Sequence, residues 1–342
     1  MKKRLLSALL ALCMMLTMMP TVAFAAEGDE TTADPPASRE GNVAYIERGT
    51  ADIYCNSLDT VIQEAQDGDT IVLLRDFDAG LTTAWGINKD LTITGNHTIT
   101  FDDYSFGIHG NNTLTLDGCH IVINNAAHTA YSDKPDNAAI MLDQGATLTL
   151  NNEASLVIDS PKGDGIATWD VGQTKETLNI LNGSFYELKH SPGGGVEDYN
   201  GDSENVYINI DNQSRVYFHD NYSGFIGTLH VTSNNSIIDV INNTGNGSNG
   251  SDYNLTDSTV TFNDNGSHGM SARDITMVNS TVNADNNGCY GVYTKGQFTV
   301  DKTSKMNVTN NSSKGDYAGL KITSGVTAGK VENGAEITIT DM

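Results

Sequence analysis

The chain has 342 residues, with 19 Lys and Arg against 43 Asp and Glu, so its formal net charge is −24 at pH 7. Such an acidic surface repels nucleic acid and anionic lipid, which excludes both as main partners. Glycine is abundant at 34 residues and proline is rare at 6. Together with many Asn, Asp, Thr and Ser residues, this composition favours short strands joined by many turns.

Residues 1–25 have the features of a secretory signal peptide. Residues 2–4 are basic, residues 5–19 are apolar, and small residues at Ala23 and Ala25 fit a cleavage site. The apolar run of about 15 residues is short for a membrane span, which needs roughly 20. We therefore expect a secreted or cell-surface protein without membrane insertion after cleavage. Residues 26–44 are acidic and poor in apolar residues, and we expect them to be a disordered linker.

Residues 57–77, SLDTVIQEAQDGDTIVLLRDF, combine two periodicities. Apolar residues from Leu58 to Ala65 recur at helical spacing, whereas the run Ile71–Leu74 is typical of a strand buried on both sides. Only the turn DGD separates them. We predict a helix over residues 57–66 that covers the open end of a stack of strands, followed by the first buried strand.

Two later segments of the chain align with each other without gaps. TDSTVTFNDNGSHGM spans residues 256–270, and VNSTVNADNNGCYGV spans residues 278–292. A repeat offset of about 22 residues indicates a stacked architecture. One inward-facing position recurs through the chain, and we assign it to Ile99, Ile121, Leu156, Tyr186, Val216, Ile238, Val260, Val282, Met306 and Ile337.

Each repeat unit is predicted to hold three short strands. An alternating strand such as LTIT at Leu91 comes first, the recurring inward position lies in the second, and a Gly-apolar pair such as Gly107–Ile108 or Gly165–Ile166 opens the third. Strands this short need parallel partners in the next unit, about 4.8 Å away. Pairs of Asn residues are expected at the corners. The sequence therefore predicts an all-β, single-stranded parallel β-helix of about ten coils over residues 45–342.

The stretch at residues 57–77, the LTITG that follows it and the Gly- and Asn-rich coils resemble a known family. They are similar to the secreted pectate-lyase-like parallel β-helix (β-solenoid) surface proteins of Gram-positive bacteria. This resemblance implies a right-handed helix. It does not settle the activity, because the fold carries lyases, hydrolases, adhesins and structural repeats.

The sequence contains no complete catalytic motif of the hydrolases or of the lyases that have this fold. The hydrolases use clustered Asp residues and a Gly-His-Gly turn, and SHGMS at residues 267–271 is the nearest match, without an Asp pair beside it. The lyases need Ca²⁺ and a basic residue, and Arg215 and Arg273 have no evident carboxylate partner in the sequence. No catalytic residue is assigned on these grounds.

Two insertions follow the third strand in adjacent coils, at residues 167–177 and 197–205. Because they should stack at one edge, we expect them to form a ligand-binding site. Aromatic rings pack on sugar C–H faces, carboxylates accept hydroxyl hydrogen bonds, and grouped carboxylates can also hold Ca²⁺. In the alternative, the two aromatic residues pack on each other within the loops and the acids are merely solvated. The site is assigned to Trp169, Asp170, Glu197, Asp198 and Tyr199.

These features favour a non-enzymatic exported protein that acts in adhesion or glycan binding, with a glycan or a host or cell-surface molecule as its partner. An extracellular polysaccharide lyase or glycoside hydrolase is one alternative, and the structural stalk of a larger surface protein is another. No cofactor is expected, and the grouped carboxylates leave Ca²⁺ binding open. Cys55, Cys119 and Cys289 are expected to be small buried thiols rather than a disulfide framework.

The sequence ends on GAEITITDM, with Ile337 and Ile339 at inward positions of a second strand. A parallel coil that stops there exposes backbone groups and an apolar core end. We therefore expect a C-terminal continuation or end-to-end association of chains.

Overall fold

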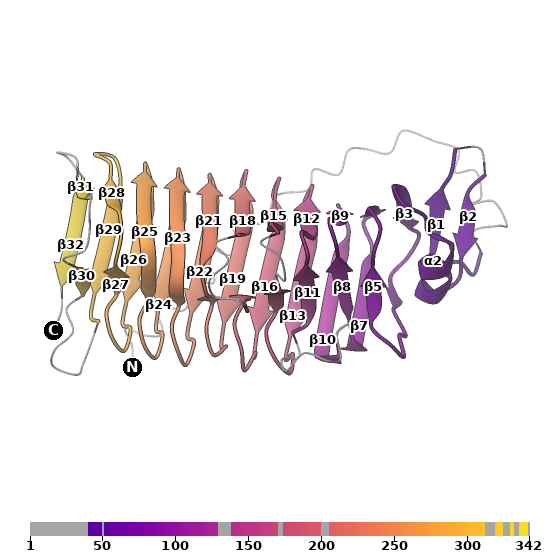
Figure 1. The fold of residues 1–342 in the computed structure, drawn as a ribbon, viewed down its shortest axis with the longest axis horizontal. Coiled ribbons are helices and arrows are strands. Elements are labelled where there is room, and N and C mark those ends of the chain that lie inside the picture. The colour runs from indigo at the N-terminus through magenta and orange to yellow at the C-terminus, as the bar shows by residue number, and fades with distance from the viewer. Residues whose placement is uncertain are drawn as a thin grey trace, which may run out of the picture. The chain divides into compact units, whose positions relative to one another are not determined.

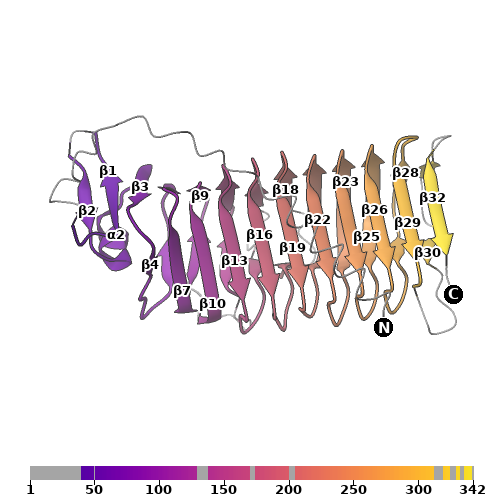
Figure 2. The same ribbon diagram turned by 180° about the vertical axis from the view of Figure 1, so that it is seen from behind.

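In the computed structural model of the protein, residues 40–49, 51–128, 138–169, 174–199, 205–311, 319–323, 329–331 and 335–340 are described. The predicted signal peptide and residues 26–39 of the predicted linker lie outside these ranges. Residues 41–342 form one compact unit, in which the strands stack along one long axis (Figures 1 and 2). Within the described ranges, no helix is long and apolar enough to cross a membrane.

Each coil contributes up to three strands, which run parallel to the equivalent strands of the neighbouring coils. The first strands are β3 (Asp69–Leu73), β6 (Leu91–Thr94), β9 (Thr113–Asp117), β12 (Thr147–Asn151), β15 (Glu176–Ile180), β18 (Val206–Asp211), β21 (Leu229–Asn234), β28 (Phe298–Val300) and β31 (Gly329–Val331). The third strands are β5 (Trp85–Ile87), β8 (Phe106–His109), β11 (Ile140–Asp143), β14 (Ile166–Trp169), β17 (Val196–Asp198), β20 (Phe225–Ile226), β27 (Val292–Thr294) and β30 (Leu320–Ile322). β23 (Ser248–Thr256) and β25 (Met270–Val278) each serve as a third strand and then as the first strand of the next coil, which joins both sets into one sheet.

The second strands form a separate 11-stranded parallel sheet. They are β4 (Phe77–Asp78), β7 (Thr98–Tyr104), β10 (His120–His128), β13 (Ser155–Asp159), β16 (Phe185–Lys189), β19 (Arg215–His219), β22 (Ile237–Ile241), β24 (Thr259–Asn263), β26 (Thr281–Asp285), β29 (Lys305–Thr309) and β32 (Glu336–Thr340). The predicted parallel β-helix of about ten coils is therefore confirmed.

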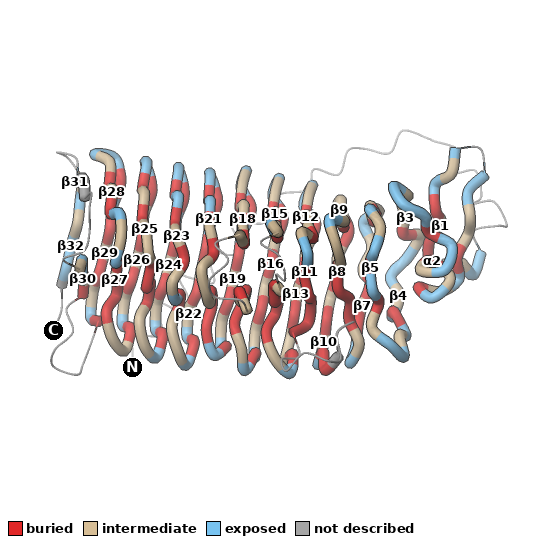
Figure 3. The backbone as a smooth tube through the Cα atoms, viewed as in Figure 1, coloured by how far each residue is buried: buried red, intermediate tan, exposed pale blue. Residues whose placement is uncertain are grey.

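The predicted column of inward-facing residues is confirmed along its whole length. Each member lies in register with the next, from Ile99 opposite Ile121 to Met306 opposite Ile337. All members from Ile99 to Met306 are buried, and Figure 3 shows buried segments recurring from coil to coil. Because full burial of one such side chain contributes roughly 1.5–3 kcal/mol, this column is a main source of stability.

The register of the third strand differs from the prediction in one early coil. Phe106, and not Ile108, lies opposite Ile140, which in turn lies opposite Ile166. Gly107 and Ile108 therefore occupy the positions of Met141 and Leu142. The Gly-apolar pair misleads here because Phe106 and Ile108 both face the core, so a strand of period two allows either assignment.

The stack begins with a helix and two antiparallel strands. The predicted helix is confirmed as α2 (Leu58–Glu64), which buries Leu58 and Val61. The Ser57 side chain caps its first turn by accepting a hydrogen bond from Thr60 N at 3.2 Å. β1 (Ala44–Glu47) pairs antiparallel with both β2 (Ile53–Cys55) and β3. The sequence did not predict β1 and β2, and β1 begins at the last residue of the predicted linker. All of them lie at the N-terminal end of the stack (Figure 1).

Asparagine side chains hold the corner between the second and third strands. The inner ladder, defined as Asn221, Asn243, Asn265, Asn287 and Asn311, is buried. From Asn243 onward, each Nδ2 donates to the Oδ1 of the next member at 2.8–2.9 Å. Three members follow a surface Asn whose backbone is left-handed, with φ of 53–56° at Asn242, Asn286 and Asn310. The predicted corner role of Asn pairs is thus confirmed.

The three cysteines that the structure describes are free thiols. Cys55 and Cys119 are buried as predicted, whereas Cys289 is half-buried. Burial raises the pKa of the Cys119 thiol to about 12, so this residue is a packing group and not a nucleophile.

Apolar side chains are exposed at core positions of the last described coil. Ile339 in β32 lies opposite Val308, and Val331 in β31 lies opposite Val300. Val308 and Val300 are buried, whereas Ile339 and Val331 are about half exposed, at 49% and 52%. The expected continuation or end-to-end association at this end stays a prediction.

Candidate functional site

The two aromatic residues of the predicted site lie together. Trp169 ends β14, Tyr199 follows β17 in the next coil, and their ring centroids are 6.0 Å apart with planes inclined at 34°. Both rings pack on a small apolar cluster of Ala138, Met141 and Ala167, which is separate from the main core. This is the mutual packing expected from the alternative interpretation of the loops. It fixes Tyr199 in place beside the groove described below.

The two described acidic residues of the predicted site differ in exposure. Glu197 faces outward from β17 and is partly exposed. Asp198, assigned to the ligand site from the sequence, takes the inward position opposite Thr168 and is only 5% exposed. The reason is the strand period of two, which places Val196 and Asp198 on the same side. Asp170 lies outside the described residues.

A groove of about 510 Å³ opens beside Tyr199. We call it the tyrosine groove. It crosses four successive coils, from Lys162 in the first to Asn246 in the last, which corresponds to about 14 Å along the axis at the usual strand spacing. Its lining includes Tyr199, Tyr222, Glu197 and Lys162, and Tyr222 is 55% exposed. Rings, a carboxylate and an ammonium group therefore line one open cleft.

Glycine-rich turns bring the coils close together beneath the tyrosine groove. Gly194 N donates to Asp164 Oδ1 at 2.5 Å, and Ser191 Oγ donates to Gly163 O at 2.6 Å. A Cβ added at Gly193 would lie 2.1 Å from Asp164 Oδ1, so any larger residue would displace the Asp164 side chain. Asp164 is buried and thus shapes the groove floor.

A second polar group of residues, which the sequence did not predict, lies on the first strands. Tyr207, His230 and Asp252 occupy equivalent positions of adjacent coils. The Tyr207 ring stacks on His230 with centroids 4.8 Å apart, and His230 Nδ1 is 3.1 Å from Asp252 Oδ2. Arg273 Nε donates to Asp252 Oδ1 at 2.8 Å. A smaller groove of about 250 Å³, lined in part by His230, Asp252 and Gln297, lies beside them.

Both arginines considered in the sequence have carboxylate partners in the folded chain. Arg273 binds Asp252, and Arg215 Nη2 is 2.8 Å from Asp239 Oδ2. Each partner lies in the preceding or following coil, 21 and 24 residues away. The signal was present in the repeat offset of the sequence, because residues one offset apart stack in space.

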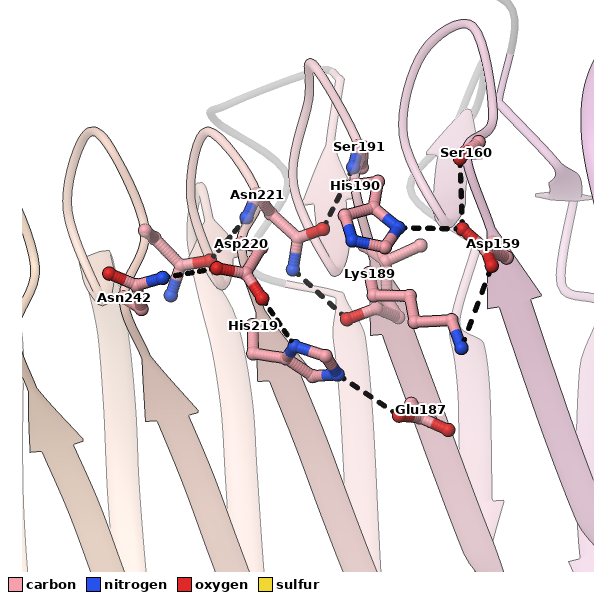
Figure 4. A network of polar contacts seen from close by, with 12 residues as sticks. Asp159, Ser160, Glu187, Lys189, His190, Ser191, His219, Asp220, Asn221 and Asn242 are labelled. Atoms are coloured by element: carbon pink, nitrogen blue, oxygen red, sulfur yellow. Dashed lines mark hydrogen bonds and ion pairs between the residues drawn. The ribbon is translucent and has the colours of Figure 1, made fainter. Parts of the chain in front are cut away.

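A third network, on the 11-stranded sheet and its corner, joins side chains of adjacent coils (Figure 4). His219 lies between two carboxylates, with Nε2 3.0 Å from Glu187 Oε1 and Nδ1 2.8 Å from Asp220 Oδ2. His190 Nδ1 is 2.8 Å from Asp159 Oδ1. The hydrogen bond from His219 is the main cause that holds the pKa of Asp220 below its ordinary value. Since its members bind one another, this network ties coils together and offers little to a ligand.

The comparisons with known proteins add little to this geometry. No family model matches the sequence, and no curated protein matches it. Among solved structures, the chain is similar to a double mutant of the periplasmic alginate epimerase AlgG, with a TM-score of 0.29, 12% identity, and coverage of 84% of this chain and 83% of that chain. This likeness gives no argument for a shared activity. The parallel β-helix is established by the strand register itself.

Within the described parts of the chain, no group of three or more His, Cys, Asp or Glu residues is placed to hold a metal ion. Ca²⁺ binding at the predicted site stays open, because Asp170 and the middle of each loop insertion, residues 170–173 and 200–204, lie outside those parts.

Proposed function

We propose that the protein is an exported glycan-binding protein whose ligand lies in the tyrosine groove. The observation that supports this most strongly is the exposure of Tyr222 in the same open cleft as Tyr199, with Glu197 and Lys162 beside them. Tyrosine rings pack on the apolar C–H faces of sugars, and charged groups form strong hydrogen bonds with hydroxyls. The groove spans about 14 Å of the stack, so an oligosaccharide fits its length better than a single sugar.

The proposal includes a place outside the cell and a role in adhesion. The features of residues 1–25 support export, and the resemblance to secreted pectate-lyase-like surface proteins supports a location at the surface. A long, rigid stack that presents one lateral groove suits attachment to a glycan on a host or neighbouring cell. Adhesion requires only binding, and the tyrosine groove provides the groups for it.

The test is glycan binding by the full chain, by two variants of the groove and by one control variant. A glycan array identifies a ligand, and titration calorimetry then measures its dissociation constant. Tyr222→Ala should weaken binding about tenfold, or about 1.4 kcal/mol, because the variant loses the apolar area that the ring buries against the sugar. Tyr45→Ala is the control, since Tyr45 packs on Tyr54 in the N-terminal cap, far from the groove. Unchanged affinity in both Tyr222→Ala and Glu197→Gln would overturn the proposal.

A second candidate function is polysaccharide cleavage at Tyr207, His230 and Asp252. The observation that favours it is the contact of His230 Nδ1 with Asp252, which places the basic lone pair of a neutral imidazole at Nε2. A histidine oriented by a carboxylate and stacked on a tyrosine is suited to general acid–base chemistry. Here Arg273 holds Asp252 in position.

Cleavage is tested by incubating the full chain with acidic and neutral polysaccharides and measuring new reducing ends and unsaturated products. Activity that is lost in His230→Gln, while glycan binding in the tyrosine groove is kept, would establish this candidate. Absence of product from every polysaccharide that the chain binds would remove it.

A further inference from the structure

The tyrosine groove lies on a face that continues toward the C-terminal coils. Equivalent residues of successive third strands lie in register, one in each coil: Glu197, Ile226, Asn249, Ser271, Tyr293 and Lys321. Of these, Ser271 is buried. Tyr293 is four coils beyond Glu197, which corresponds to about 19 Å along the axis. Residues around Tyr293 therefore belong to the same lateral face as the groove.

Three rings gather at Tyr293. His268 and Tyr290 are 22 residues apart and stack with centroids 5.3 Å apart and planes inclined at 12°. Tyr290 in turn stacks with Tyr293 at 5.6 Å and 25°. Tyr290 is only 8% exposed, and its backbone N–H donates to His268 Nδ1 at 3.2 Å. The buried Tyr290 thus fixes the positions of two half-buried rings, His268 and Tyr293.

Two lysines surround the Tyr293 ring. Lys295 Nζ is 5.6 Å and Lys321 Nζ is 5.4 Å from its centroid, so both ammonium groups lie close to one ring. Lys321 Nζ also donates to Tyr290 Oη at 3.0 Å. Burial first, and then these two ammonium groups, lower the pKa of His268. Two ammonium groups therefore lie beside this ring cluster, on a chain whose net charge is −24.

We propose that His268, Tyr293, Lys295 and Lys321 form a second saccharide subsite, which selects a sugar carrying an anionic group, either carboxylate or sulfate. The ring faces pack on the sugar, and the ammonium groups pair with the anion. This inference rests on the proposed function, because one extended glycan would occupy both the tyrosine groove and this subsite.

Charge complementarity explains why an anionic glycan would choose this site. The acidic remainder of the protein repels a polyanion, whereas the subsite attracts one sugar acid and orients the polymer along the face. A neutral glycan of the same length gains no ion pair here. The subsite therefore acts on selectivity, and its contribution should fall as salt screens the lysines.

The test compares three oligosaccharides of equal length, one carboxylated, one sulfated and one neutral, in calorimetric titrations with the full chain. We expect at least one anionic ligand to bind about tenfold more tightly than the neutral one at low salt, and this preference to shrink at high salt. The double variant Lys295→Gln, Lys321→Gln should lose the preference, because it weakens binding of the anionic ligand more than binding of the neutral one. The matched control is Lys302→Gln, Lys305→Gln, which removes the same charge from an exposed turn and β29.

The outcomes separate the subsite from the tyrosine groove. A preference for only the carboxylated or only the sulfated ligand identifies the anion and supports the subsite. Equal affinity for all three ligands, weakened throughout by Tyr222→Ala, would keep the groove and overturn the subsite. A preference that survives the Lys295, Lys321 double variant, or is lost equally in the control, also overturns it. Failure of every ligand to bind would overturn both proposals.

Discussion

Replacing Val260 by Asp is expected to unfold the coils around β24. Val260 is fully buried and lies in register between Ile238 and Val282, which are also fully buried. Loss of the apolar side chain removes about 2 kcal/mol of burial. An unpartnered neutral carboxyl in the core adds about 1–3 kcal/mol, and an ionised one costs more. The total of about 3–5 kcal/mol is a large part of the roughly 5–15 kcal/mol that stabilises an ordinary domain.

Urea unfolding followed by circular dichroism measures this loss, and hydrogen exchange shows whether it centres on residues 237–285. Thr259→Asp is the matched control, because Thr259 is the preceding residue of the same strand and is exposed. It should change the free energy of unfolding by less than about 0.5 kcal/mol. If Val260→Asp unfolds at the same urea concentration as Thr259→Asp, the inward column has been assigned to the wrong face and the reasoning fails.

Four further predictions concern the inner ladder, acid stability, catalysis and the C-terminal coil. The Asn265 side chain takes part in four hydrogen bonds, three with neighbouring members of the inner ladder and one with Val240 O. Asn265→Ala should therefore cost about 3 kcal/mol in urea unfolding, against less than about 1 kcal/mol for the half-buried Asn307→Ala. Equal losses would contradict the role of the ladder. Hydrogen bonds, chiefly from Ser304, lower the pKa of Asp301 to about 2. Asp301 therefore stabilises the fold above its unfolded pKa of about 3.9, and this stabilisation is lost as pH falls toward 2. The urea midpoint of Asp301→Asn should lack this part of the dependence on pH, and a pH profile equal to that of the unchanged protein would contradict the prediction. The protein should not cleave polygalacturonate with or without Ca²⁺. Cleavage products that form with the unchanged protein and not with His230→Gln would contradict this prediction. Amides of residues 326–342 should exchange faster than those of β24, since Ile339 is exposed at a core position; strong protection of Ile337–Ile339 in a monomeric sample would refute this.

The fold could be predicted because burial of apolar residues at inward positions recurs at a fixed spacing in the sequence. A residue at an inward position, such as Val260, meets the residue one repeat offset away, and that offset is visible without any structure. The prediction failed where the rule does not hold. β1 and β2 pair antiparallel, and their spacing in the sequence does not match the repeat offset, so the repeat does not predict them. At Gly107–Ile108 the period of two allowed two registers, and packing of Phe106 selects between them.

The candidate site was harder to predict because its residues come from different coils. Asp198 was predicted to lie in the loop insertion that begins at residue 197, whereas β17 continues through Asp198 and buries it. The contact of His230 with Asp252 follows the repeat offset and could have been found by aligning the coils. Lys321 lies opposite Tyr293 in the next coil, but the segment between them is longer than the repeat offset and hides this pairing from any fixed spacing.

The central claim is that a glycan lies in the tyrosine groove, and hydrogen-exchange mass spectrometry of the full chain with and without a bound glycan tests it most directly. We expect the ligand to slow exchange in peptides covering residues 191–199 and 222–226, which line the groove, and to leave the 11-stranded sheet at β22 and β24 unchanged. Slowed exchange confined to that sheet, with the groove peptides unaffected at saturating ligand, would contradict the claim.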